Sequence, residues 1–394
     1  MTDGTDAARI SERARAVEPQ GIREMFDLAA EQDGDLVHLE FGEPDFDTPE
    51  HVVAAAHDAA SAGKTNYTAN AGITELREAV ADYLAHDGPR PDPDSEVAIT
   101  TGGVEALHLA IHAVADPGSE VVVPTPAWPN PISQARLADA TPVEVPMPAE
   151  AGFSPDADRI VEAIGPDTAA VVLTSPSNPT GRVCDRETVA RVTAAAADHD
   201  AYVLADEVYR DLTYTDRPPR AAAVADRPEW VLTVGSVSKA YAMTGWRVGW
   251  LAGPSDVLGQ VIKIRESTTS CVNTPAQYAA LAALTGPQDP VDEMRAAFEA
   301  RRDYVFDRLD SIPDVSAARP EGAFYAFVDV SALEGSSDEV ARRLLTEYGV
   351  VTAPGTAFGA GGEGHLRLSF ANSEERLEAG LDRLETMVAD DRNR

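Results

Sequence analysis

Short apolar runs alternate with helical stretches through the middle of the chain. The runs have the length and flanking Gly, Pro or Asp residues of buried strands, and they occur within residues 96–103, 121–124, 169–181, 201–209, 230–236 and 247–253. Between two of these runs, residues 103–115 carry Leu107 and Ile111 on one helical face, and residues 186–200 have a similar pattern. This strand–helix alternation predicts an α/β fold with a mostly parallel central sheet covered by helices on both faces.

The pattern changes after about residue 290. Long charged helical stretches at 291–312 and 336–349 surround short strand-like runs at 322–330 and 364–371, which is typical of a smaller α+β domain. The first 47 residues contain too little apolar surface for a core of their own. We therefore expect three segments: residues 1–47 packing on the small domain, a large domain at 48–288, and the small domain at 289–394.

The charge excludes several classes of partner. The 394 residues include 66 Asp and Glu against 32 Lys and Arg, a formal net charge of -34. Nucleic acid and anionic membranes bind basic surfaces, so neither is expected. Such an acidic excess with few lysines is typical of proteins from a high-salt cytoplasm, although an acidic protein from ordinary salt is the alternative.

The remaining composition points to the cytoplasm. The two cysteines, Cys184 and Cys271, form no CxxC pair, and the N-terminal sequence has no apolar run typical of a signal peptide. No stretch reaches the roughly 18 apolar residues that a membrane-spanning helix needs. His108 and His112 are four residues apart, but no third ligand is apparent, so we expect no metal site.

Polar residues follow several of the predicted strands directly. Asp206 ends one strand, the segment 236–239 follows another, and Asn178 lies in the turn after a third. Gly102 and Gly103 end a fourth strand and open a helix, whose free backbone N–H groups could bind a phosphate. Because ligands of open α/β sheets bind at the carboxyl ends of the strands, these segments predict one shared crevice.

Lys239 stands out in a chain that has only three lysines. Lys64 and Lys263 have no comparable surroundings, whereas Lys239 follows Ser236 and Ser238 and precedes Arg247. A buried amine beside an arginine should have a lowered pKa, and a neutral amine can form a Schiff base with an aldehyde. An aldehyde-bearing phosphate cofactor is pyridoxal 5'-phosphate, which also needs a carboxylate at its ring nitrogen.

Eight motifs in order along nearly the whole chain resemble one family. They are FGEPDFDTPEHV, YTANAGITELREAV, PTPAW, SPSNPTG, ADEVY, SVSKAYAMTGWRVGW, PEGAFY and HLRLSFA. The chain resembles the class I, fold-type I pyridoxal-phosphate-dependent aminotransferases, and within them the prokaryotic aspartate and aromatic aminotransferases. The resemblance implies the fold of that family, the cofactor and an aminotransferase reaction.

The same resemblance implies the catalytic residues. Lys239 corresponds to the lysine that holds the cofactor and moves the substrate proton, and Asp206 corresponds to the partner of the ring nitrogen. Tyr209 and Asn178 correspond to the pair that contacts the ring oxygen. Trp128 corresponds to the aromatic residue that stacks on the ring.

The other binding residues follow in the same way. The implied phosphate-binding groups are Ser236, Ser238, Arg247 and the N–H groups of Gly103 and Val104. Tyr67 corresponds to a tyrosine that reaches the phosphate of a neighbouring subunit, which implies a homodimer. Arg367 corresponds to the arginine that binds the substrate α-carboxylate, and Gly42 lies where the N-terminal segment passes over the substrate; Trp128 and Asn178 are implied substrate contacts as well.

The sequence leaves the substrate open. The expected reaction moves the amino group of an amino acid, with aspartate favoured, to 2-oxoglutarate by a ping-pong mechanism. Some aspartate-specific members have a lysine where this chain has Val104. Aromatic, alanine or other aliphatic donors are therefore alternatives, as are, more remotely, another fold-type I reaction such as a β-lyase or decarboxylase and a pyridoxal-phosphate-binding regulator.

Overall fold

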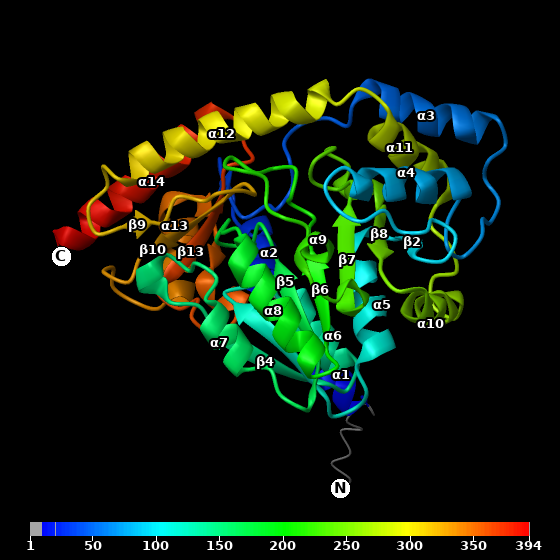
Figure 1. Ribbon diagram of the computed structural model, residues 1–394. Helices are drawn as coiled ribbons and strands as arrows, with labels where there is room; N and C mark the ends of the chain where they lie inside the picture. Colours follow the sequence, from blue (N-terminus) through cyan, green and yellow to red (C-terminus); the bar gives the residue numbers. More distant parts are fainter. Residues whose placement is uncertain (1–9, 20, 394) are drawn as a thin grey trace, which may run out of the picture.

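The computed structural model describes residues 10–19 and 21–393. Its centre is a seven-stranded sheet with the strand order β2-β8-β7-β6-β5-β3-β4, visible in Figure 1. In that order the strands are Val97–Thr100, Gly249–Ala252, Val231–Ser236, Tyr202–Asp206, Thr168–Thr174, Glu120–Thr125 and Thr141–Pro146. Only β8 runs antiparallel to its neighbours, so the prediction of a mostly parallel sheet is confirmed.

Helices cover both faces of this sheet. They are α3 (Glu50–Ser61), α4 (Thr74–Ala85), α5 (Gly102–Val114), α6 (Asn130–Leu137), α7 (Ala157–Glu162), α8 (Arg186–Asp198), α9 (Ala221–Val224), α10 (Ser255–Glu266) and α11 (Thr274–Thr285). Strand β5 shows why two layers are needed: Ala170 and Val172 pack in the cluster of α5, α6 and α10, whereas Val171 and Leu173 pack in the cluster of α8. An apolar run buried on both faces is typical of parallel strands.

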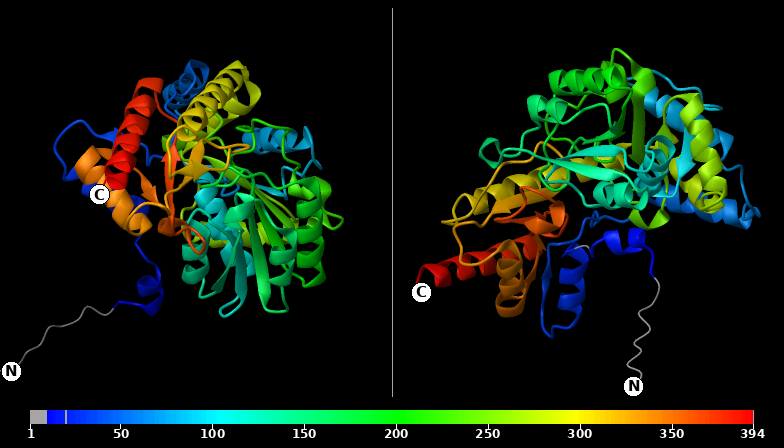
Figure 2. Two further views of the ribbon diagram at one scale, coloured as in Figure 1. Left: turned by 90° about the vertical axis from the view of Figure 1, so that its left-hand side faces the viewer. Right: turned by 90° about the horizontal axis from the view of Figure 1, so that it is seen from below.

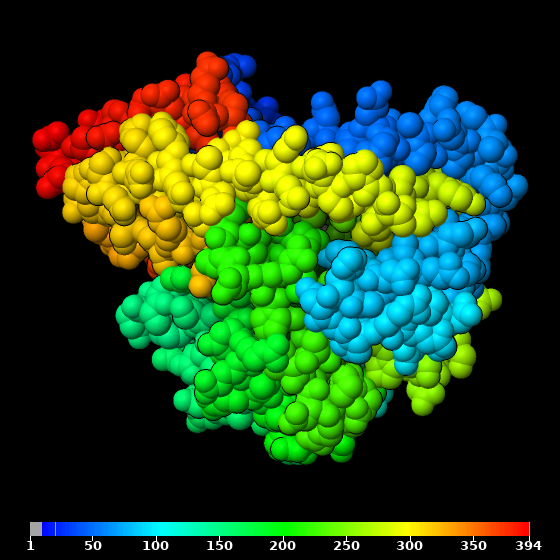
Figure 3. Space-filling model, turned by 45° about the horizontal axis from the view of Figure 1, so that its top comes forward, coloured from blue at the N-terminus to red at the C-terminus, as the bar shows by residue number. Residues whose placement is uncertain are grey.

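The C-terminal part forms a second, smaller layer. Its four-stranded antiparallel sheet has the order β12-β13-β10-β9, that is Ala353–Pro354, His365–Ser369, Tyr325–Asp329 and Ser316–Ala317. Its helices are α12 (Asp289–Leu309), α13 (Ser337–Tyr348) and α14 (Glu374–Arg392). Figure 3 shows α12 as a yellow ridge that runs between the two parts.

The N-terminal segment packs against this smaller layer. It contains α1 (Glu12–Ala16), α2 (Gly21–Ala30) and β1 (Val37–His38), and β1 pairs in parallel with β11 (Val350–Val351). Met25 and Leu39 share a buried cluster with side chains of α12, α13 and α14. Figure 2 shows the dark blue α2 beside the orange α13. The three-segment division of the chain stays a prediction. These contacts place the N-terminal segment against the smaller layer.

Four short 3-10 helices complete the described elements: η1 (Ala149–Ala151), η2 (Pro228–Trp230), η3 (Thr244–Trp246) and η4 (Gly355–Phe358). Among the described residues, no helix is both long enough and apolar enough to cross a membrane.

Candidate active site

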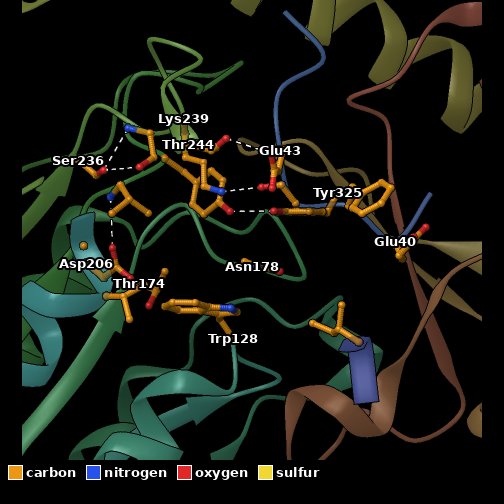
Figure 4. Close-up of a pocket in the computed structure, with 18 of the residues that line it drawn as sticks. Glu40, Glu43, Trp128, Thr174, Asn178, Asp206, Ser236, Lys239, Thr244 and Tyr325 are labelled. Carbon is orange, nitrogen blue, oxygen red and sulfur yellow. Dashed lines mark hydrogen bonds between the residues drawn. The ribbon is translucent and has the colours of Figure 1, made fainter. Parts of the chain in front are cut away.

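A cavity of about 780 Å³ opens where the large sheet, the small sheet and the N-terminal segment meet. It lies at the carboxyl ends of β5, β6 and β7, as expected for an open α/β sheet. Figure 4 shows Ser236 and Asp206 on one side of it and Glu40 on the other. The cavity therefore has two ends, one built by the sheet and one by the N-terminal segment.

Lys239 lies in the turn after β7 with its amine inside the cavity. Its Nζ donates a hydrogen bond to the carbonyl of Gly42 at 2.5 Å and lies 5.6 Å from the ring centroid of Tyr209. Burial lowers the pKa of Lys239 to about 8, and the nearby Arg367 and Arg247 act in the same direction, while Glu43 opposes them. The amine therefore loses its proton at a lower pH than an exposed lysine, which is the direction that the sequence predicted.

Asp206 ends β6 and faces the same cavity. It is buried, and its Oδ1 accepts the backbone N–H of Val208 at 3.3 Å. Burial raises the pKa of Asp206 to about 6. A buried carboxylate of this kind is stabilised when a cationic hydrogen-bond donor is placed against it.

The groups predicted to bind phosphate converge at the start of α5. Ser236 Oγ lies 2.8 Å from Ser238 Oγ, and both side chains are buried. Gly102 has φ +77°, and a Cβ at this position would come within 2.7 Å of the Arg247 Nη2. Glycine therefore keeps the guanidinium and the free N–H groups at the start of α5 close together. This set of donors is that of an anion site.

Arg367 on β13 lines the same cavity. It is 2% exposed, its Nη1 donates to Asn178 Oδ1 at 3.1 Å, and its Nη2 donates to the carbonyl of Glu40. Its guanidinium lies 4.6 Å from the ring centroid of Tyr325. Its Nε has no partner within the described part of the chain. A buried guanidinium with a free donor is suited to bind a carboxylate.

Two tyrosines, Tyr209 after β6 of the large sheet and Tyr325 on β10 of the small sheet, meet at the cavity. The hydroxyls of Tyr209 and Tyr325 lie 2.8 Å apart, and both side chains are buried. A Cβ on Gly42 would lie 2.8 Å from the Tyr325 hydroxyl, so a larger residue at position 42 would displace that pair. The close passage of the N-terminal segment thus depends on this glycine.

The structure brings nearly all predicted site residues together. Those that line the cavity are Gly42, Gly103, Val104, Trp128, Asn178, Asp206, Tyr209, Ser236, Ser238, Lys239, Arg247 and Arg367. Tyr67 is different: it does not line the cavity, and its side chain is 89% exposed.

Sequence reasoning missed several lining residues. Glu43 and Tyr325 belong to two of the eight motifs but have no role implied by the resemblance, Glu40 directly precedes the first motif, and Thr174 lies in the apolar run 169–181. Arg23, Phe26 and Phe41 come from the N-terminal segment, which has no strong motif before Phe41. Only the three-dimensional packing of α2 brings Arg23 and Phe26 to the site.

Comparisons with known proteins assign the family. The family model described as "Aminotransferase class I and II" matches residues 34–384. The chain belongs to this family. It is 41% identical to the aspartate/prephenate aminotransferase of Thermus thermophilus over 95% of this chain and 97% of that protein.

Two further matches extend the range of relatives. The aromatic-amino-acid aminotransferase 2 of Thermococcus litoralis is 37% identical over 96% of this chain and 98% of its own length. A solved structure of the aspartate aminotransferase from Thermus thermophilus with maleate matches with a TM-score of 0.91 and 40% identity, covering 96% of this chain and 99% of that one. The chain is an aminotransferase, and its fold and family agree with the expectation from its motifs.

Proposed function

We propose that this aminotransferase uses pyridoxal 5'-phosphate to transfer the amino group of an amino acid, with aspartate as the favoured donor, to 2-oxoglutarate. The observation that carries the proposal is the buried Lys239, whose amine lies in one cavity with Asp206 and the anion site at α5. The relatives named for aspartate support the choice of donor.

The residues present fit this cofactor. Ser236, Ser238 and Arg247 would hold its phosphate together with the first N–H groups of α5. The buried Asp206 carboxylate would bind the protonated ring nitrogen, which offsets the cost of its burial. The cofactor supplies, when bound, an aldehyde and an electron-withdrawing ring that stabilises negative charge at the substrate Cα.

The side chains around the ring would fix its plane. Trp128 lies across the cavity from Lys239 in Figure 4 and would form one wall for the ring. Tyr209 and Asn178, which both line the cavity and are both buried, would contact the ring oxygen.

Lys239 would carry the proton in the reaction. With a pKa of about 8 its Nζ is readily neutral, and a neutral amine can accept the proton of the substrate Cα and later return it. Arg367 would bind the α-carboxylate through its free donor, and Asn178 would keep the guanidinium in place. The carbonyl of Gly42, which accepts a hydrogen bond from the Lys239 Nζ, lies at the same cavity.

A second donor class has structural support. Val104, Ile22, Phe26 and Phe41 give the cavity apolar surface, which suits an aromatic side chain. The aromatic aminotransferase among the relatives points the same way. Aromatic amino acids are therefore the second candidate donors.

We also propose a homodimer in which Tyr67 reaches the partner's phosphate. The 89% exposure of Tyr67, which is large for an aromatic side chain, supports this role. The free cysteines, Cys184 and Cys271, support a reducing cytoplasm as the setting. The acidic composition supports a high salt concentration there.

A half-reaction with single amino acids tests the function. Reconstituted enzyme in high salt is mixed with aspartate, glutamate, phenylalanine, tyrosine or alanine without an oxo acid, and the cofactor absorbance is followed. Conversion to the pyridoxamine form, fastest with aspartate, is expected. Fastest conversion with phenylalanine or tyrosine favours the second candidate, and no conversion with any of them contradicts the proposal.

A further inference from the structure

Among the described residues, four cationic side chains line the active-site cavity. They are Arg23, Lys239, Arg247 and Arg367. Under the proposed function Lys239 handles the proton, Arg247 the phosphate and Arg367 the α-carboxylate. Arg23 is the remaining cation, and a dicarboxylic substrate has one more carboxylate to place.

Arg23 lies on α2 at the outer end of the cavity. Its guanidinium carbon is 4.7 Å from the ring centroid of Phe26, and that ring packs edge-on against Phe41 at 5.7 Å. Phe26 and Phe41 both line the cavity. The contact with Phe26 therefore places the guanidinium beside the cavity wall, although most of the Arg23 side chain stays exposed to solvent.

The present ion pair of Arg23 is weak. Its Nε lies 3.1 Å from Asp27 Oδ1, one helical turn away, and the two side chains are 70% and 62% exposed. Exposed pairs of this kind contribute little to stability, because water screens them. A substrate carboxylate with fixed position can therefore displace Asp27 at little cost.

The other cavity walls offer a distal carboxylate fewer favourable contacts than Arg23 does. Val104 brings an apolar side chain to the wall at α5, and Trp128 an aromatic one. Glu40 is a buried acid whose Oε1 lies 2.7 Å from His38 Nδ1, and a second carboxylate would not gain from its neighbourhood. Within the described residues, attraction for a second carboxylate is concentrated at Arg23.

We propose that Arg23 binds the distal carboxylate of glutamate, 2-oxoglutarate and aspartate while Arg367 binds the α-carboxylate. This inference rests on the proposed function and names the group that takes the place of a lysine at position 104. The contact forms at the exposed end of the cavity, so it is screened by salt more strongly than the contact to the buried Arg367.

Equilibrium binding to the reconstituted enzyme tests the assignment. Glutarate and pentanoate both have five carbons, but only glutarate has a second carboxylate, and neither has an amino group to react. Calorimetry on Arg23→Gln should show glutarate binding weakened about 10-fold and pentanoate binding unchanged, because one charge-assisted hydrogen bond is lost. Asp27→Asn, which frees Arg23, should strengthen glutarate binding.

Arg342→Gln is the matched control. Arg342 lies on α13, and its Nη2 is 3.9 Å from Oε2 of Glu24, which is on α2 like Arg23. Arg342 does not line the cavity, so this variant changes the net charge near α2 without removing the proposed contact. It should bind both acids like the wild type. If glutarate binding is weakened as much in Arg342→Gln as in Arg23→Gln, the effect comes from the general electrostatic field near α2. That result would overturn the inference.

Two further outcomes would overturn it. Equal weakening of glutarate and pentanoate in Arg23→Gln would mean that Arg23 only maintains the packing of α2. No change for either acid would mean that another group binds the distal carboxylate. These failures are distinct from failure of the proposed function, in which the wild type converts no amino acid at all.

Discussion

The two ends of the active-site cavity hold charge in different ways. At the end formed by the large sheet, Asp206, Ser236 and Lys239 are buried and fixed by strand ends and tight turns. At the end formed by α2, Arg23 is largely exposed and pairs with Asp27 on its own helix. The buried end fixes the chemistry of the reaction, whereas the exposed end can change with the substrate without disturbing the core.

The largest test of this difference is the removal of the amine at the buried end. Lys239→Ala should lower the rate of the half-reaction about 10⁴-fold, since no other side chain at the site offers a neutral amine. Lys263→Ala is the control, because Lys263 contacts Gln260 on α10 and does not line the cavity, so this variant should leave the rate unchanged. A wild-type rate in Lys239→Ala would remove this residue from its proposed role.

The buried carboxylate should have the next largest effect. Asp206→Asn keeps the shape but removes the charge, so the rate should fall about 10³-fold and the cofactor should be lost more readily on dialysis. Rate and retention are measured on the same preparation by absorbance. Unchanged kinetics and retention would show that Asp206 is only a structural residue at the end of β6.

The pH dependence follows from the lowered pKa of Lys239. Capture of pyridoxal by the cofactor-free protein needs the neutral amine, so its rate should rise with pH and level off above about pH 8. At pH 6 the rate should be about 100-fold below the plateau, because only about 1% of the amine is neutral there. Pyridoxal without phosphate avoids the titration of the phosphate itself. A rate that keeps rising tenfold per pH unit beyond pH 9 would indicate an ordinary exposed amine.

Arg367→Lys compares the two arginines directly. The loss of a planar, two-pronged contact should raise the KM about 30-fold, by a similar factor for aspartate and for phenylalanine, because both have an α-carboxylate. Arg23→Gln, in contrast, should affect dicarboxylic substrates alone. An effect of Arg367→Lys restricted to aspartate would reverse the assignment of the two ends.

The smallest expected effect is at the anion site. Gly102→Ala combines a positive φ with a Cβ placed 2.7 Å from Arg247 Nη2, so cofactor affinity should fall about 10-fold. Gly118→Ala is matched, since Gly118 has φ +88° and no atom within 4 Å of an added Cβ. Equal losses in affinity for the two variants would mean that backbone strain, not the contact with Arg247, is the cause.

The difference between the buried and the exposed end of the cavity also explains which parts of the molecule could be predicted from the sequence. The sheet strands are continuous apolar runs that end in polar residues, and α5 opens with two glycines, so the fold and the buried end of the site could be predicted from local pattern. Gly42 and Arg367 were found because they belong to strong motifs.

The exposed end could not be predicted in this way. Arg23 and Phe26 reach the cavity because Met25 and Ala29 pack α2 into the core cluster that also holds side chains of α12, α13 and α14, and this long-range packing has no local sequence signature. Tyr67 shows a related limit, since its predicted partner is on another subunit and one chain leaves it exposed.

The most direct test of the account is to identify the lysine that holds the cofactor. Borohydride reduction of the holoenzyme, followed by digestion and mass spectrometry, fixes and locates the cofactor, and the chain has only three lysines to distinguish. We expect the mass increase of the cofactor on the peptide that contains Lys239. Labelling of Lys64 or Lys263 instead, or no labelling in an enzyme that transaminates, would contradict it.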